Sequence, residues 1–219
     1  MIIDRFYPII PDINWLRRLL PLGIKTVQLR VKNESEDEIR RQIKAAIELT
    51  DMTDCQLIIN DYWQLAIELG GAFIHLGQED LARADLNAIK NAGLKLGLSS
   101  HDHTELETAI AAEPDYIALG PIYETKLKKM KWAPQGLDRI REWKSEIKSA
   151  IKLQIGCPLV AIGGLTVETA PDIFAAGADS LAVVTDIVTH DEPERRVMEW
   201  LDVTAEKRNI IKKGISTGL

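Results

Sequence analysis

The feature that most constrains the fold of this chain is a regular alternation of short apolar runs with longer amphipathic stretches. It repeats eight times over 219 residues. The longer stretches place apolar residues three and four positions apart, which is the spacing of a helix, and the short runs are typical of strands. The predicted strands cover residues 6–10, 26–31, 56–59, 72–74, 95–98, 116–119, 159–162 and 180–184. The predicted helices cover residues 13–20, 36–52, 62–69, 81–92, 105–112, 137–151, 167–176 and 192–211.

Eight strands joined by helices are expected to pair in parallel, because each helical connection returns the chain to the same end of the sheet. Eight such units are enough to close a sheet into a cylinder without exposed edges, and the chain is near the lower end of the length that this needs. The sequence therefore predicts an α/β fold, a single-domain TIM (β/α)8 barrel over residues 1–219. An open, doubly wound sheet is the competing architecture.

Residues that cap helices support these boundaries. Asp12 and Ser35 stand directly before two predicted helices, where a side-chain oxygen can accept a hydrogen bond from the first turn. Gly23, Gly70 and Gly177 stand where a helix ends and the chain needs a left-handed residue before the next strand.

The composition narrows the classes of function. A net charge of −6 argues against a general nucleic-acid binder, which needs a basic surface. The first residues do not resemble a signal peptide, and no apolar run approaches the ~20 residues of a membrane helix. Cys55 and Cys157 stand alone without metal-ligand spacing, so we expect buried thiols in a reducing compartment. These observations predict a cytoplasmic protein, monomeric or homo-oligomeric, with no nucleic-acid or membrane partner.

Polar side chains alternate through the end of the second predicted strand. Gln28, Arg30 and Lys32 share one face, and the apolar residues between them share the other. In a barrel the polar face would point into the mouth, where two neighbouring cations suit a polyanion such as a diphosphate. The alternative is a strand that frays into solvent.

Two carboxylates follow the next two strands. Asp61 comes directly after the third predicted strand, and Asp80 lies just beyond the fourth. The carboxyl ends of barrel strands meet at one rim, which is where such folds keep their chemistry. Two carboxylates there, completed by water and substrate phosphate oxygens, suit Mg²⁺. Because each Asp also precedes or opens a helical pattern, an N-cap is the alternative for both.

Two further segments indicate anion binding at the same rim. The loop of residues 122–135 carries Thr125 and four lysines, and a mobile phosphate clamp with Lys128 as the contact competes with a solvated charge run. After the seventh and eighth strands, Gly164 and the pair Val184-Thr185 predict backbone donors for a phosphate monoester. A tight turn alone would also explain the glycine.

Three more residues admit two interpretations each. Ser99 could donate a hydrogen bond to a ligand or cap the helix that follows. His101 could act as a base, although no nucleophile stands beside it in sequence. His75 is better interpreted as a hydrogen-bonded interior group than as a ligand. Trp143 and Trp200 lie on apolar helical stripes and are expected to pack in the core.

In order, these segments resemble the thiamine-phosphate synthase family from residue 7 to about residue 193. The matching motifs are Q-L-R-V-K (28–32), I-N-D-Y-W (59–63), H-L-G-Q-E-D-L (75–81), G-L-S-S-H (97–101), D-Y-I-A-L-G-P-I-Y (115–123), A-P-Q-G-L (133–137), V-A-I-G-G-L (160–165) and G-A-D (177–179).

The resemblance implies a transferase that joins 4-amino-5-hydroxymethyl-2-methylpyrimidine diphosphate to thiazole phosphate, giving thiamine phosphate and diphosphate. The positions that match contacts to the pyrimidine diphosphate are Gln28, Arg30, Lys32, Asn60, Ser99 and Lys128, with Arg30, Lys32 and Lys128 in catalytic roles. The positions that match the Mg²⁺ ligands are Asp61 and Asp80. The positions that match the thiazole phosphate site are Thr125, Gly164, Val184 and Thr185.

One residue departs from the family pattern. The family usually has T-x-T-K in the clamp loop, and this chain has Leu127 in place of the second threonine. A lost hydrogen bond to a charged group is worth roughly 1.5–3 kcal/mol, so we expect weaker binding of the thiazole phosphate. Two other functions remain open. One is a thiazole tautomerase, for which His101 would supply acid–base chemistry, and the other is a non-catalytic barrel that binds a phosphorylated metabolite.

Overall fold

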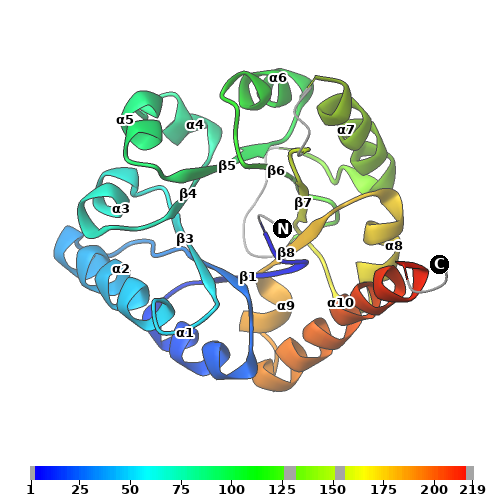
Figure 1. The fold of residues 1–219 in the computed structure, drawn as a ribbon, viewed down its shortest axis with the longest axis horizontal. Coiled ribbons are helices and arrows are strands. Elements are labelled where there is room, and N and C mark those ends of the chain that lie inside the picture. The colour runs from blue at the N-terminus through cyan, green and yellow to red at the C-terminus, as the bar shows by residue number, and fades with distance from the viewer. Residues whose placement is uncertain (1–2, 126–131, 151–155, 216–219) are drawn as a thin grey trace.

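The protein is a closed cylinder of parallel strands surrounded by helices. The computed structural model describes residues 3–125, 132–150 and 156–215, with side chains described up to residue 205. Within these ranges, eight strands follow one another around the cylinder in chain order, and the eighth pairs with the first. Figure 1 shows this ring of strands with the helices outside it. The predicted TIM barrel is confirmed, and the open sheet is wrong because the two ends of the sheet pair.

The predicted strands are all present, and their ends agree to within two residues. Almost every strand residue is buried, as expected for parallel strands covered by helices on one face and by the barrel interior on the other. The strands are β1 (Phe6–Ile10), β2 (Thr26–Leu29), β3 (Gln56–Asn60), β4 (Phe73–Leu76), β5 (Lys95–Ser100), β6 (Tyr116–Leu119), β7 (Leu159–Ile162) and β8 (Ser180–Val183).

The helices differ more from the prediction than the strands do. The helix predicted over residues 81–92 is shorter, because Asp85 caps it and it covers only residues 86–91, and a separate short helix over residues 78–81 precedes it. A short helix after β8 was not predicted. The helical elements are α1 (Ile13–Leu19), η1 (Leu20–Leu22), α2 (Glu36–Thr50), α3 (Trp63–Leu69), α4 (Gln78–Leu81), α5 (Leu86–Asn91), α6 (His103–Ala111), α7 (Gly136–Ala150), η2 (Val167–Thr169), α8 (Ala170–Ala176), α9 (Thr185–Val188) and α10 (Pro193–Ile215).

The predicted capping residues are confirmed. The Asp12 carboxylate accepts hydrogen bonds from two backbone N–H groups of the first turn of α1, at 2.7 and 3.1 Å. Ser35 Oγ accepts one from the first turn of α2 at 3.3 Å. Gly23, Gly70 and Gly177 have φ angles of 88°, 78° and 116°, a left-handed conformation that favours glycine.

Aromatic side chains fill the interior of the barrel. Tyr7, Phe73 and Tyr116 are each no more than 1% exposed and pack together there. Gly97 on β5 makes room for one of these rings, because a Cβ atom at this position would lie 2.1 Å from Cζ of Tyr116. The interior is therefore a packed core that closes one end of the cylinder.

A second apolar layer lies between the strands and the helices. Trp143 of α7 and Trp200 of α10 are completely buried in it, as predicted. The expected buried thiols are also confirmed. Cys55 and Cys157 are free, and burial raises the pKa of each thiol to about 12, so neither is a reactive thiolate near neutral pH.

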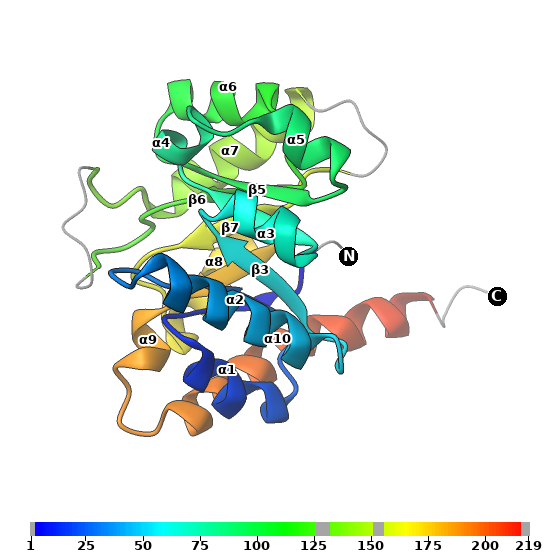
Figure 2. The ribbon, with the colours of Figure 1, turned by 90° about the vertical axis from the view of Figure 1, so that its left-hand side faces the viewer.

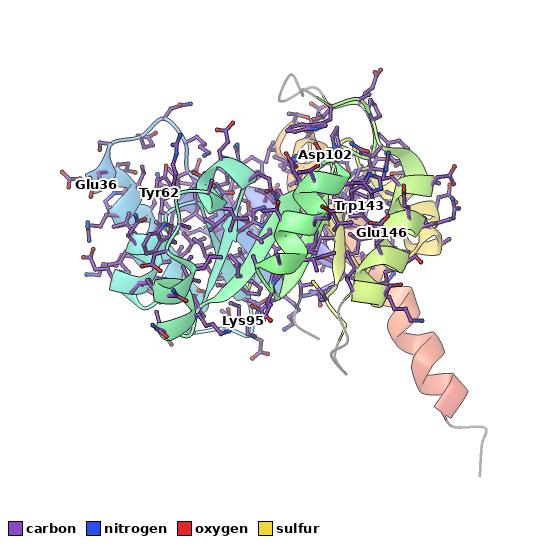
Figure 3. All side chains as sticks on the ribbon, turned by 90° about the horizontal axis from the view of Figure 1, so that it is seen from above. Glu36, Tyr62, Lys95, Asp102, Trp143 and Glu146 are labelled. Atoms are coloured by element: carbon purple, nitrogen blue, oxygen red, sulfur yellow. The ribbon has the colours of Figure 1, made fainter. Side chains whose placement is uncertain are left out.

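The strands place their carboxyl ends at one end of the barrel. Figure 2 shows the described end of α10 on one side of the molecule and residues 120–125, which follow β6, on the opposite side. In Figure 3, Lys95 at the start of β5 and Asp102 just beyond it lie at opposite ends, and α10 projects away from the barrel. Across the described part of the chain, none of the helices combines the length and the hydropathy that crossing a membrane requires.

Candidate active site

A cavity of roughly 530 Å³ opens at the carboxyl ends of the strands, and every strand contributes to its lining. This volume is within the range of small-molecule sites. The predicted site residues that line it are Gln28, Arg30, Lys32, Asn60, Asp61, Asp80, Ser99, Thr125, Gly164, Val184 and Thr185. The predicted clamp residue Lys128 and its neighbours Lys126, Leu127, Lys129 and Lys131 lie outside the described residues. The fold therefore brings together all of the predicted residues that it describes.

The polar face of β2 continues past the end of the strand. Gln28, Arg30 and Lys32 line the cavity, and the two apolar residues between them are buried. Although β2 ends at Leu29, the Arg30 backbone N–H still donates to the Ile10 carbonyl at 2.9 Å. Pairing with β1 thus continues one residue past the strand, and Arg30 and Lys32, which are both exposed, stand at the open side of the cavity.

Asp61 occupies the turn between β3 and α3. Its φ of 66° is left-handed, a conformation that Asp adopts more readily than most residues. The N-cap of α3 is Tyr62, without a side-chain capping bond, so the N-cap interpretation of Asp61 is wrong. The Asp61 carboxylate instead forms an ion pair with the Lys32 ammonium group across the cavity wall.

Asp80 lies in the first turn of α4, whose N-cap is Gly77, so it does not cap this helix either. Burial raises the pKa of the Asp80 carboxyl, and the charge of Asp61 and a hydrogen bond with its carboxyl raise it further. Two carboxylates this close repel each other when both are ionised. A divalent cation between them relieves that repulsion, and the two oxygen donors fit such an ion with water and substrate oxygens completing its shell.

Ser99 belongs to β5, which runs to Ser100. The cap of α6 is Asp102, whose carboxylate accepts the Glu105 N–H at 3.0 Å, so the interpretation of Ser99 as a helix cap is wrong. Ser99 Oγ lies 2.9 Å from Nε2 of His75 and lines the cavity.

His75 is 8% exposed and makes hydrogen bonds through both ring nitrogens, so its interpretation as a satisfied interior group is confirmed. Nδ1 lies 2.7 Å from the Tyr116 hydroxyl. Burial lowers the pKa of the His75 imidazole to about 4, and the ring is therefore neutral at neutral pH.

His101 lines the cavity but already has partners. Its Nδ1 lies 2.6 Å from a Glu105 carboxylate oxygen, and its ring stacks on Trp132 with centroids 4.0 Å apart. The Gln135 side-chain amide donates to the His101 carbonyl at 2.8 Å. These contacts attach the end of the loop after β6 to the end of β5.

The two glycines after β7 are required by packing as well as by conformation. Gly163 and Gly164 have φ angles of 98° and 69°. A Cβ atom on Gly164 would lie 2.4 Å from the Glu124 carbonyl oxygen and 2.8 Å from Cβ of Tyr123. The tight-turn explanation therefore accounts for the glycines, and the turn brings their backbone to the cavity beside Thr185.

A buried arginine behind the cavity joins the loops after β7 and β8. Arg196 of α10 donates two hydrogen bonds to Glu168 of η2, at 2.9 and 3.0 Å, and two to Asp186 of α9, at 2.8 and 3.0 Å. Trp200 Nε1 donates to the same Asp186 carboxylate at 2.8 Å. The sequence prediction missed this cluster, since its members come from three separate segments.

Several known proteins are similar to this chain in sequence over most of its length. The profile of the family described as thiamine monophosphate synthase matches residues 4–187. This chain belongs to that family. The thiamine-phosphate synthase of Rhizobium etli is 54% identical over 210 residues, which cover 96% of this chain and 100% of the relative. The thiamine-phosphate synthase of Salmonella schwarzengrund is 42% identical over 208 residues, which cover 95% of this chain and 92% of the relative.

A solved structure agrees on the fold. The thiamine phosphate pyrophosphorylase from Pyrococcus furiosus aligns with a TM-score of 0.78 over 92% of this chain and 96% of its own, at 22% identity. The resemblance noted in the sequence is thus confirmed, and family membership makes this protein a transferase of thiamine biosynthesis.

The sequence prediction missed Tyr7, at the edge of the cavity, and Tyr116, which lies buried beside it. Tyr7 lines the cavity, and its hydroxyl lies 2.8 Å from that of Tyr116. Each stands inside an apolar strand pattern, where a tyrosine is interpreted as a core residue rather than as part of a binding site. The available signal was the strand periodicity of two, because Tyr7 and Ile9 share one face and both line the cavity.

Proposed function

We propose that this protein is a Mg²⁺-dependent thiamine-phosphate synthase. It condenses 4-amino-5-hydroxymethyl-2-methylpyrimidine diphosphate with thiazole phosphate and releases diphosphate. The observation that carries the proposal is the convergence, in one cavity, of the carboxylates of Asp61 and Asp80 with the cations of Arg30 and Lys32. Such a site suits a substrate that carries several negative charges and a metal ion.

The family resemblance assigns the roles of the site residues in this proposal, and their shared place on the rim supports that assignment. Arg30 and Lys32 bind the diphosphate and act in catalysis, together with Lys128 of the clamp loop. Gln28, Asn60 and Ser99 complete the pyrimidine diphosphate site on the β2–β5 side. Thr125, Gly164, Val184 and Thr185 bind the thiazole phosphate on the β6–β8 side. The two substrates would thus meet at the centre of the barrel mouth.

The chemistry needs charge stabilisation and orientation. The bond between the pyrimidine methylene carbon and the diphosphate oxygen breaks, and its electron pair leaves with the diphosphate. Arg30 and Lys32 are placed to stabilise the charge that grows on this leaving group. Mg²⁺, held by Asp61 and Asp80, would neutralise further diphosphate charge. The thiazole nitrogen then attacks the methylene carbon and forms the new C–N bond, while the two halves of the site hold the partners in register.

The alternative functions explain less of the site. A thiazole tautomerase has no use for the cationic and carboxylate residues of the β2–β4 side, which line the same cavity as its candidate acid–base residue, His101. A non-catalytic barrel would bind the same ligands without turnover. The 54% identity to a named thiamine-phosphate synthase favours the synthase reaction over both alternatives.

The decisive experiment mixes the purified full chain with both substrates and measures diphosphate release and thiamine phosphate formation. We expect both products with Mg²⁺ and neither after chelation of divalent ions by EDTA. Omitting thiazole phosphate should abolish thiamine phosphate formation. Binding of both substrates by calorimetry without release of diphosphate would reject the synthase in favour of the non-catalytic barrel. Isomerisation of a thiazole in the absence of the pyrimidine would favour the tautomerase.

A further inference from the structure

A mixed cluster of one histidine and two glutamates lies on the outside of the barrel. His103 begins α6, and Glu142 and Glu146 are four residues apart on α7. One ligand atom from each side chain lies within 4.8 Å of the other two, and none of the three residues lines the cavity. Figure 1 shows α6 and α7 as neighbours outside the ring, and Figure 3 shows Trp143 and Glu146 of α7 beside the start of α6 at Asp102.

The distances between these atoms are those between neighbouring ligands of one metal ion. His103 Nε2 lies 3.0 Å from Glu142 Oε1 and 3.4 Å from Glu146 Oε1. Ligand atoms that are each about 2.1 Å from an ion lie about 3.0 Å apart in octahedral geometry and about 3.4 Å apart in tetrahedral geometry. The three side chains therefore need little movement to share an ion.

The described side chains leave the second carboxylate without a hydrogen bond. His103 Nε2 carries at most one hydrogen, and Glu142 is the nearer acceptor, at 3.0 Å. Within the described residues, Glu146 forms an ion pair only with His103, at 3.4 Å. The two carboxylates also repel each other, because like charges four residues apart on a helix are neighbours. A divalent cation would bind both carboxylates and the imidazole nitrogen at once.

Neighbouring groups hold two of the three ligands in place. The His103 ring packs on Trp143 with centroids 4.8 Å apart, and the Trp143 indole N–H donates to Ser100 Oγ at 3.0 Å. Arg139 pairs with the other oxygen of Glu142 at 2.9 Å, which leaves Oε1 to face His103. Arg139 also lies 3.4 Å from Nδ1 of His103, a long contact that a metal-bound ring would release. Ligands fixed before binding lose less entropy when the ion arrives.

We propose that His103, Glu142 and Glu146 bind a divalent ion such as Zn²⁺, which links α6 to α7. One imidazole nitrogen and two carboxylate oxygens suit Zn²⁺, with water completing the shell, whereas Mg²⁺ favours oxygen ligands alone. The site is separate from the proposed Mg²⁺ site, because Asp61 and Asp80 line the cavity. The inference does not depend on the proposed function, since no substrate takes part in it.

Calorimetry with Zn²⁺ tests the site on the full-length chain. The protein is stripped with EDTA, returned to a buffer without chelator and titrated in excess Mg²⁺, which fills the proposed site at Asp61 and Asp80. We expect one Zn²⁺ per chain, with an affinity that the excess Mg²⁺ changes by less than about twofold. No binding of Zn²⁺ would overturn the proposal and leave the cluster as a group of surface ion pairs.

Variants test which residues hold the ion. His103→Gln and Glu146→Gln should each weaken Zn²⁺ binding at least about tenfold, because each removes a ligand. Glu107→Gln is the matched control, since Glu107 is exposed on α6 outside the cluster, and His190→Gln removes a histidine elsewhere. Both controls should keep the wild-type affinity. Unchanged affinity in His103→Gln or Glu146→Gln would overturn the proposal, because the ion would then bind at another place.

Thermal unfolding adds a measurement that does not depend on how stable each variant is. Zn²⁺ at about a hundredfold excess over its Kd should raise the Tm of wild type by several degrees, because the ion binds the folded chain. His103→Gln should keep its own Tm when Zn²⁺ is added, whatever that value is. An equal rise in the two proteins would overturn the proposal.

Discussion

The two halves of the barrel mouth are built in different ways. On the β2–β5 side, the cavity is lined by charged and polar side chains that stand at or just past the strand ends, such as Arg30, Asp61 and Ser99. On the β7–β8 side, the lining includes Gly163 and Gly164, which have no side chain, and the apolar residues Leu165 and Val184, while hydrogen bonds of Arg196 join the loops that carry them.

This difference indicates how ligand specificity can be changed on each side. On the β2–β5 side, which we call the side-chain half, a substitution directly alters the chemistry at the ligand. On the β7–β8 side, which we call the backbone half, the ligand would contact backbone N–H groups. Ligand binding there would change only when a substitution alters the shape of the loops. Substitutions and a change of pH can test whether the two halves differ in this way, and the largest effect is expected at Asp61.

Asp61→Asn should lower kcat on the order of a thousandfold, because it removes one charge from the proposed metal site and from the ion pair with Lys32. Asn accepts the left-handed backbone at this position, whereas Ala would add strain. Steady-state diphosphate release and the Mg²⁺ concentration for half-maximal rate measure the effect. Near-normal turnover would remove Asp61 from the metal site.

Acidification should destabilise the side-chain half through His75. The unfolded imidazole has a pKa of 6.5 and the folded one about 4, so between these values the unfolded state binds more protons. The stabilising contribution of the neutral ring is complete above pH 6.5. It decreases as the pH falls toward 4, by roughly 3 kcal/mol in total.

Urea unfolding at pH 7 and pH 4.5 measures this loss. His75→Gln should flatten the pH dependence, because it removes the titrating group. His103→Gln is the comparison variant, since it removes a histidine that is 51% exposed and pairs with Glu142 at the surface, and it should change the dependence less than His75→Gln does. Equal slopes for wild type and His75→Gln would contradict the prediction.

Arg196→Met should act on the backbone half alone. It removes the four hydrogen bonds that join Glu168 to Asp186 and a fifth to Glu199, and we expect a loss of about 3 kcal/mol in the free energy of unfolding. The KM for thiazole phosphate should rise several-fold, and the KM for the pyrimidine diphosphate should stay within twofold.

Arg195→Met is the control for this variant. Arg195 is 66% exposed, and its pairs with Glu192 and Glu199 are on the surface, so its loss should cost less than about 1 kcal/mol. Equal effects of the two variants on the thiazole phosphate KM would show that the Arg196 cluster does not support the loops.

Gly164→Ala should lower the free energy of unfolding by about 2 kcal/mol, because the new Cβ would lie 2.4 Å from the Glu124 carbonyl oxygen on a left-handed backbone. It should also raise the thiazole phosphate KM by displacing the loop. Gly156→Ala is the control, since no atom lies within 4 Å of where its Cβ would be, and it should be neutral. Thermal unfolding and the two KM values compare them.

Much of the fold and of the side-chain half was predictable from the sequence. Strand and helix periodicity is local, so the eight repeats and their order could be read directly. Arg30, Asp61 and Asp80 were predictable for the same reason: each follows a strand, and the fold places all strand ends at one rim. The exact division of helices was not. Asp85 starts a second helix within one amphipathic pattern, and a short helix follows β8.

The sequence alone determined the repeating β/α units and the charged residues that follow their strands, because both depend on spacing between near neighbours. Only the tertiary structure decided that β1 pairs with β8, and that Tyr7 and Tyr116, 109 residues apart, share a hydrogen bond. It also decided that Arg196 supports two distant loops. The physical reason is that these contacts form only once the barrel closes and buries the polar groups, which must then find their partners within it.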